Sequence, residues 1–229
     1  MRTPSAPLSR RLLAEFVGTA ILLAAIIGSG IAAQRLSPND VGLELLENAL
    51  ATSAALVAII LAFGPVSGAH FNPVITLADR LVGGMTTAPA VGYVLVQLAG
   101  AALGAVVANL MFSLPAAEVS TKVRSGAGLW LAESVATFGL VLVVLALVRS
   151  GRATLAAPAV GVYIGAAYWF TASTSFANPA VTVARTLSDT FAGIAPGSVV
   201  PFILAQLVGA GIAVAAARFL YPLPPAPAE

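Results

Sequence analysis

Two short stretches of the chain decide its fold: Phe71-Asn72-Pro73-Val74-Ile75-Thr76-Leu77-Ala78 and Ala177-Asn178-Pro179-Ala180-Val181-Thr182-Val183-Ala184. Each contains an Asn-Pro pair followed by an apolar segment that is too short to cross a bilayer, since a helical span needs about 20 residues. Asparagine is a strong helix N-cap, and proline is favoured at the first helical position. The two stretches therefore predict re-entrant half-helices over residues 72–81 and 178–187.

Six longer apolar segments surround these stretches. Hydrophobic residues make up 59% of the 229-residue chain and charged residues only 9%, whereas soluble domains average about 25% charged residues. Six membrane spans are expected over residues 14–33, 45–64, 89–112, 128–148, 155–171 and 197–220. The chain has no cysteine, so neither a disulfide nor a thiolate metal site can form. We expect no metal, no cofactor and, with a net charge of +2, no nucleic-acid partner.

The landmarks of the chain occur twice and in the same order. Asn72 and Asn178 are 106 positions apart, Glu15 and Glu133 are 118 apart, and Gln97 recurs as Gln206 after 109. Because each half contains an odd number of spans, the second half must enter the membrane upside down. The sequence thus predicts an all-α membrane protein with six transmembrane helices, two re-entrant half-helices and an inverted 3+3 repeat.

The repeat also divides the chain into segments. We expect a cytoplasmic N-terminus at 1–11, a first repeat at 12–112, an extracellular loop at 113–127, a second repeat at 128–220 and a disordered cytoplasmic tail at 221–229. Cytoplasmic loops carry an excess of Lys and Arg. With the N-terminus inside, seven of the eleven Lys and Arg residues fall on the cytoplasmic side of the inner (plasma) membrane.

Pairs of small residues at four-residue spacing occur on three spans: Gly100 and Gly104, Gly161 and Gly165, and Gly209 and Ala213. Small residues allow helices to approach closely. The pattern alone does not separate packing within the bundle from contact between copies of the chain, and we favour internal packing.

The asparagines have a direct physical interpretation. Inverted symmetry points the N-termini of both half-helices at the membrane centre, and each N-terminus carries about half a positive charge. Asn72 and Asn178 can cap these helices and still offer amide hydrogens to a passing solute. Such a positive constriction, rich in hydrogen-bond donors, excludes cations and interrupts a proton-conducting water wire.

These residues resemble the signature motifs of the aquaporin family. Ser67-Gly68-Ala69-His70-Phe71-Asn72-Pro73-Val74 is similar to the first signature loop, and Asn178-Pro179-Ala180 to the second. Ala14-Glu15 and Ala132-Glu133 match the paired helix glutamates, and the likeness covers about residues 12–220. The resemblance implies that Glu15 and Glu133 brace the re-entrant loops and that His70 lies at the cytoplasmic end of a pore. Loop bracing and solute contact are both open for His70. The resemblance also implies a homotetramer in membrane lipid.

The chain departs from the family at the outer filter. Most members place an arginine three residues after the second asparagine, where this chain has Val181. By family spacing the four filter positions are Thr52, Ala166, Ser175 and Val181. The assignment in span five drifts from Ala166 toward Tyr168 when it is counted from the start of that span. Arg185, one helical turn beyond Val181, is expected in the outer vestibule.

A filter of Thr, Ala, Ser and Val would be small-sided, nearly neutral and wide. It resembles that of bacterial aquaporin-like proteins associated with arsenic resistance, which also lack the arginine. We therefore expect a passive channel for small uncharged solutes such as glycerol, urea, water and trivalent arsenic or other metalloid acids. A water-selective aquaporin and a proton-coupled secondary transporter are the alternatives. An enzyme is not expected, because no nucleophile, base and oxyanion-hole set can be assembled around a single histidine.

Overall fold

The computed structural model describes residues 6–222, which form a helical bundle without β-strands. Six helices are long and apolar enough to cross a membrane. Their helical bounds are α1 Leu8–Leu36, α2 Val41–Ser67, α4 Thr87–Met111, α5 Ala127–Arg149, α6 Ala156–Phe170 and α8 Val199–Leu220. Three short 3₁₀ turns, Ala153–Leu155, Arg185–Leu187 and Pro196–Ser198, lie beside them. The predicted membrane fold class is confirmed.

The two half-helices begin where the sequence predicts. α3 spans Pro73–Leu81 and α7 spans Pro179–Ala184. The side-chain oxygens of Asn72 and Asn178 cap them by accepting backbone N–H bonds. α7 is shorter than the predicted 178–187, because from Arg185 the chain tightens into a 3₁₀ turn.

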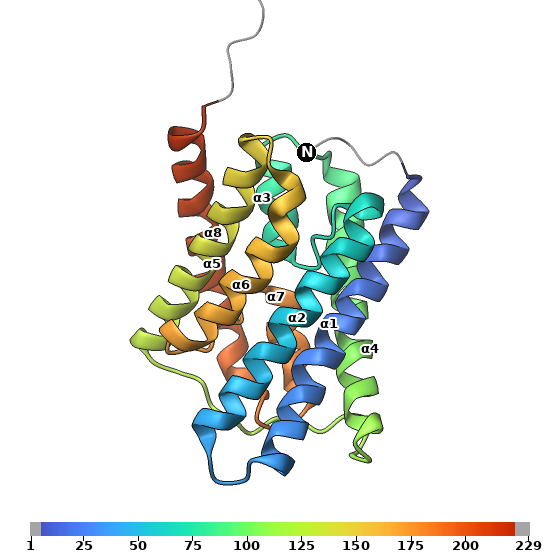
Figure 1. Ribbon diagram of the computed structural model, residues 1–229, viewed down its shortest axis with the longest axis vertical. Coiled ribbons are helices and arrows are strands. Elements are labelled where there is room, and N and C mark those ends of the chain that lie inside the picture. Colours follow the sequence, from blue (N-terminus) through green and yellow to red (C-terminus); the bar gives the residue numbers. More distant parts are fainter. Residues whose placement is uncertain (1–5, 223–229) are drawn as a thin grey trace, which may run out of the picture.

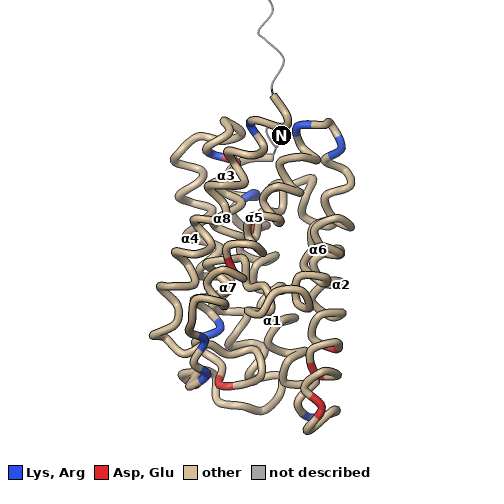
Figure 2. The backbone as a smooth tube through the Cα atoms, turned by 90° about the vertical axis from the view of Figure 1, so that its left-hand side faces the viewer, with Lys and Arg blue, Asp and Glu red and all other residues tan. Residues whose placement is uncertain are grey.

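α1 begins and α8 ends at the same end of the bundle, which is at the top of Figure 1. We call this the termini end and the opposite one the loop end. α3 lies toward the termini end and α7 toward the loop end (Figure 1). Figure 2 shows that charged residues gather near the two ends, with few in the middle, as a bilayer-spanning bundle requires. Of the predicted terminal segments, residues 1–5 and 223–229 lie outside the described residues.

Within each repeat the first and third spans pack most closely: α1 against α4, and α5 against α8. A Cβ atom added to Gly100 or Gly104 would overlap the carbonyl oxygens of Phe16 or Ala20 on α1. One added to Gly209 would overlap the carbonyl oxygen of Ser134 on α5. These small residues therefore pack within the bundle, as the favoured interpretation held.

We predict that Gly104→Ala will destabilise the bundle, because the added methyl group forces α1 and α4 apart. Overpacking of this kind costs about 1–3 kcal/mol. Gly211→Ala on α8 is the matched control, since no atom of the described residues lies within 4 Å of a Cβ added there. Thermal unfolding of both purified variants in detergent measures the difference. Equal unfolding temperatures would contradict a tight α1–α4 contact.

Candidate functional site

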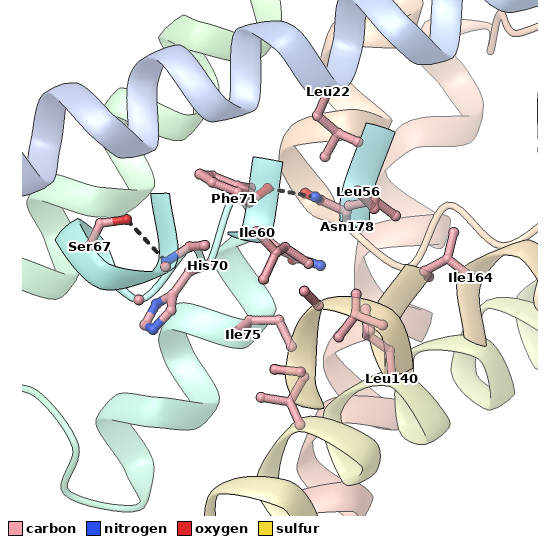
Figure 3. A pocket seen from close by; sticks show the side chains of 18 of the residues that line it. Leu22, Leu56, Ile60, Ser67, His70, Phe71, Ile75, Leu140, Ile164 and Asn178 are labelled. Carbon is pink, nitrogen blue, oxygen red and sulfur yellow. Dashed lines mark hydrogen bonds between the residues drawn. The ribbon is translucent and has the colours of Figure 1, made fainter. Parts of the chain in front are cut away.

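A cavity of about 810 Å³ runs along the inside of the bundle. On α2 its lining extends from Thr52 to Ser67, which corresponds to about 22 Å along the helix axis. Most of the wall is apolar, with side chains contributed by α1, α2, α5 and α6. Figure 3 shows several of them around the space, among them Leu22, Leu56, Ile60, Leu140 and Ile164. α4 and α8 contribute no lining residue.

The two half-helices meet at the middle of this cavity through reciprocal hydrogen bonds. The Asn72 side-chain amide donates to the carbonyl of Ala177 at 2.8 Å. That of Asn178 donates to the carbonyl of Phe71 at 2.8 Å, as the dashed line between them in Figure 3 shows. Both side chains are 5% exposed and line the cavity. Each amide group carries two hydrogens, so one hydrogen remains for a solute after the bond to the opposite loop.

The loops before the half-helices share one unusual backbone path. Ala69 and Phe71 have left-handed φ angles of 50° and 49°, and their counterparts Ser175 and Ala177 have 51° and 47°. Left-handed conformations are uncommon outside glycine, so these paired positions are a property of the repeat. No described residue donates to the carbonyl oxygens of Ala69 or Ser175, and both residues line the cavity. The path thus leaves hydrogen-bond acceptors beside the cavity.

Glu15 holds the first loop in this conformation. Its Oε1 accepts from the Ser67 hydroxyl at 2.6 Å and from the His70 amide at 2.9 Å. Its Oε2 accepts from the Phe71 amide at 2.7 Å and from the Gln97 side chain at 2.9 Å. The carboxylate is fully buried, and a buried charge is tolerated only with such partners. The geometry agrees with the bracing role inferred from the family resemblance.

Glu133 repeats the arrangement in the second half. It accepts from the amides of Phe176 and Ala177, both at 2.9 Å, and from the side chain of Gln206 at 2.6 Å. Gln206 also donates to the Thr182 hydroxyl at 2.9 Å.

Gln97 makes the equivalent bond to Thr76 at 3.0 Å in the first half. Sequence analysis noted these glutamines as repeat markers but missed their role. A glutamate, a threonine and a glutamine recur in the same order in both halves of the sequence, and this recurrence could have predicted that the three side chains lie in contact.

His70 lies toward the termini end, and its surroundings are compatible with both roles left open for it. Its Nδ1 is 3.1 Å from the Thr76 hydroxyl, and its Nε2 is 3.9 Å from the Asp79 carboxylate. The ring packs edge-on against Tyr93, whose hydroxyl donates to the Ser67 carbonyl at 2.8 Å. His70 also lines the cavity, as does Asp79.

At the loop end the structure brings together three of the four predicted filter residues. Thr52, Ser175 and Val181 all line the cavity. Ala166 does not: its side chain is exposed on the outside of the bundle. Tyr168 is 3% exposed and lines the cavity instead, and its hydroxyl lies 3.3 Å from that of Thr52.

Helical geometry explains this correction. Ile164 and Tyr168 are one turn apart and share the face of α6 that lines the cavity. Ala166 lies two residues from each, and a step of two residues turns about 200° around the helix, to the opposite face.

Arg185 is also placed differently from the expectation. Instead of standing in an open vestibule, its side chain is 2% exposed and lines the cavity. Its Nε donates to the Ala192 carbonyl, and its guanidinium lies over the ring of Phe176. Phe176 lines the cavity too, and sequence analysis did not single it out. The loop end thus has an aromatic and a cationic wall, and the expectation of a small-sided, neutral filter is wrong.

Arg124, in the segment between α4 and α5, lies near the same ring, with its Cζ 5.0 Å from the centroid of Phe176. Its Nε donates to the Gly193 carbonyl at 2.9 Å. Burial lowers the pKa of Arg124 to about 10, so this guanidinium remains charged at neutral pH. Within residues 6–222 no three His, Cys, Asp or Glu side chains gather as metal ligands would.

We predict that Glu15→Gln will destabilise the protein without abolishing transport by the folded fraction. A glutamine has one acceptor oxygen and one donor amide, so at least one of the donors around Glu15 would lose its partner at a cost of about 1–3 kcal/mol. Thermal unfolding and solute flux per folded protein measure the two effects. Glu118→Gln, on an exposed loop residue, is the control. Loss of flux in fully folded Glu15→Gln protein would indicate a proton relay instead of a brace.

Known proteins resemble this chain over most of its length. Residues 2–175 match the family described as major intrinsic protein. Aquaglyceroporin AqpS of Rhizobium meliloti (strain 1021) is 50% identical over 214 residues, which cover 93% of this chain and 91% of that protein. Aquaporin AqpM of Methanothermobacter marburgensis is 31% identical over 242 residues, 93% of this chain and 98% of that protein.

Among solved structures, that of the aquaglyceroporin from Plasmodium falciparum superposes with a TM-score of 0.70 at 20% identity, over 95% of this chain and 97% of that one. This likeness concerns the fold alone. The match to the family and the identity to AqpS carry the assignment: the chain belongs to the major intrinsic protein family.

Proposed function

We propose that this protein is a passive membrane channel for small uncharged solutes, with glycerol and water first among them and urea and trivalent metalloid acids such as arsenite as further candidates. The observation that carries the proposal is one cavity along the bundle with two inward-facing asparagine amides at its middle. The name of the relative AqpS, an aquaglyceroporin, supports glycerol as a solute. The protein is not an enzyme.

The wall of the cavity suits solutes that combine carbon and hydroxyl groups. One part of the wall consists of aliphatic side chains such as Leu56, Leu140 and Ile164. Another part consists of the loop residues with unpaired carbonyl oxygens and of the two asparagine amides. A polyol can turn its carbon chain to the first part and bond its hydroxyl groups to the second. A strongly hydrated ion would lose water here without adequate replacement.

Proton and cation exclusion is assigned to the middle of the cavity. The N-termini of α3 and α7 meet there, and each carries about half a positive charge. The amide hydrogens of Asn72 and Asn178 orient a passing water or hydroxyl oxygen, which interrupts a hydrogen-bonded water chain. Asn72, Asn178, Thr52, Ser175, Val181 and Tyr168 are the proposed solute-contacting residues.

We also propose that the termini end is cytoplasmic, in the plasma membrane. Six arginines of the described residues, Arg10, Arg11, Arg80, Arg149, Arg152 and Arg218, belong to segments at that end, against four Lys and Arg residues at the loop end. This is the asymmetry of the positive-inside rule. A homotetramer in membrane lipid is proposed from the family resemblance.

A water-selective channel is the second candidate function. Tyr168, Phe176 and Arg185 at the loop end favour it, because an aromatic and cationic wall narrows the passage for wider solutes. A coupled transporter has less support. Among residues 6–222 the only acid–base contact within 4.0 Å is His70–Asp79, and it lies toward one end of the cavity.

Flux into proteoliposomes tests the proposal. Purified protein is reconstituted, and the entry of glycerol, urea, arsenite and water is followed by light scattering or by tracer. Downhill, non-saturating glycerol flux above that of empty liposomes is expected, and it should be unchanged when a proton or sodium gradient is imposed. Water flux without glycerol flux would select the water-selective candidate. Flux that requires an ion gradient would reject a passive channel.

We predict that Val181→Arg will reduce glycerol and arsenite flux on the order of tenfold and water flux much less. Val181 is 2% exposed and lines the loop end of the cavity, so a long cationic side chain narrows the passage there. Val181→Leu changes size without adding charge and serves as the control. A Val181→Arg channel that still passes glycerol like the parent would remove Val181 from the proposed filter.

A further inference from the structure

Asp79 and Arg185 occupy equivalent positions of the two repeats. The 106-residue offset that relates the two capping asparagines also relates Asp79 to Arg185 and His70 to Phe176. All four residues line the cavity, the first of each pair toward the termini end and the second toward the loop end. Asp79 and Arg185 are only 4% and 2% exposed. The symmetry of the fold thus places one buried fixed charge near each end of the cavity, and the two charges have opposite signs.

Arg185 is held firmly enough to act as a fixed charge. Its Nε donates to the Ala192 carbonyl, and its Cζ lies 3.5 Å from the centroid of the Phe176 ring. Phe176 is itself held edge-on by Phe202, with 5.3 Å between ring centroids. Stacking of a guanidinium on an aromatic face is favourable, and more so where water is excluded. These contacts position the side chain beside the cavity.

The terminal amino groups of Arg185 remain available. Neither of its two Nη atoms donates a hydrogen bond to any residue in 6–222. No carboxylate in that range lies within 4.0 Å of it, because the His70–Asp79 contact is the only acid–base contact at that distance. The nearby guanidinium of Arg124 adds positive charge on the same side. In a low-dielectric wall a charge without an ion-pair partner acts strongly on any ion in the cavity.

The remaining wall at this level offers matching polar groups. The hydroxyls of Tyr168 and Thr52 lie 3.3 Å apart. The hydroxyl of Ser175 is buried and has no hydrogen-bond partner among residues 6–222. Val181 lies one helical turn before Arg185 and makes that part of the wall apolar.

We propose that Arg185 is the specificity-determining residue at the loop end of the pore: its guanidinium keeps cations out and donates hydrogen bonds to the oxygen atoms of neutral solutes. The inference rests on the channel function proposed above and adds a barrier to cations at the loop end, separate from the one proposed at the middle of the cavity. The chain thereby supplies a fixed cation from beyond the usual filter position, with Phe176 as the platform that holds it.

Urea and the guanidinium ion provide a size-matched test, because both are small, planar and triangular and they differ in charge. The ratio of guanidinium to urea permeability is measured in proteoliposomes containing the parent, Arg185→Met or Arg185→Lys. The parent is expected to pass urea and exclude guanidinium. Arg185→Met should raise the ratio at least about tenfold, and Arg185→Lys should keep it near that of the parent. Lys122→Met, on an exposed residue outside the cavity wall, should also leave the ratio unchanged.

The outcomes separate this inference from the proposed function. An Arg185→Met channel that passes urea with the parent's ratio would overturn the inference and leave the channel function intact. A rise of equal size in Lys122→Met would assign the effect to the general surface charge of the loop end and overturn it as well. A parent that passes neither urea nor glycerol above empty liposomes would refute the channel function itself.

A second variant keeps the test decisive if Arg185→Met does not fold. The chain has no cysteine, so Arg185→Cys introduces a unique thiol. Modification by 2-aminoethyl methanethiosulfonate returns a positive charge to this site, and methyl methanethiosulfonate adds a neutral group. The charged reagent should lower the guanidinium-to-urea ratio at least about fivefold more than the neutral reagent does. Equal effects of the two reagents would contradict a role for charge at position 185.

Discussion

The structure depends on two buried carboxylates that accept hydrogen bonds from consecutive backbone amides. Non-helical backbone at membrane depth leaves polar groups without water, and each unsatisfied group costs several kcal/mol. Glu15 and Glu133 supply acceptors at the points where the chain turns from loop to half-helix. An ionised carboxylate only accepts, so one side chain can satisfy several donors that no neutral residue could satisfy together. The re-entrant loops, and with them the cavity that they line, therefore depend on these two carboxylates.

The other features of the pore follow from that anchoring. The amides of each loop turn toward a glutamate, and the left-handed residues Ala69 and Ser175 beside them have carbonyl oxygens to which no described residue donates. α4 and α8 never reach the cavity, yet their glutamines fix the orientation of both carboxylates. The close helix contacts at Gly104 and Gly209 matter for the same reason, since they set the spacing between each glutamate and its glutamine. The shape of the pore therefore depends on the close packing of the helices around it.

Features that occur in both repeats could be predicted from the sequence. Features that depend on a local difference between the repeats could not. The capping asparagines, the glutamates and the spans carry strong local signals that occur twice, so spacing alone located them. α6 has no such landmark and begins after a 3₁₀ turn. Family spacing therefore selected Ala166, whereas the residue of α6 that faces the cavity at this level is Tyr168. The placement of Arg185 depends on a 3₁₀ turn and on the return of the chain to Ala192. Neither the turn nor this contact can be predicted from the spacing of residues in the sequence.

The reciprocal bonds between the asparagines and the opposite loops also bear on how the protein is made. Asn72 needs the carbonyl of Ala177, and Asn178 needs the carbonyl of Phe71, so neither half contains all the partners for its own loop. The N-terminal half leaves the ribosome first, with a polar loop whose last acceptor has not yet been synthesised. Its re-entrant loop obtains its full set of hydrogen-bond partners only when the second half lies beside it. Completion of the pore is thereby tied to completion of the chain.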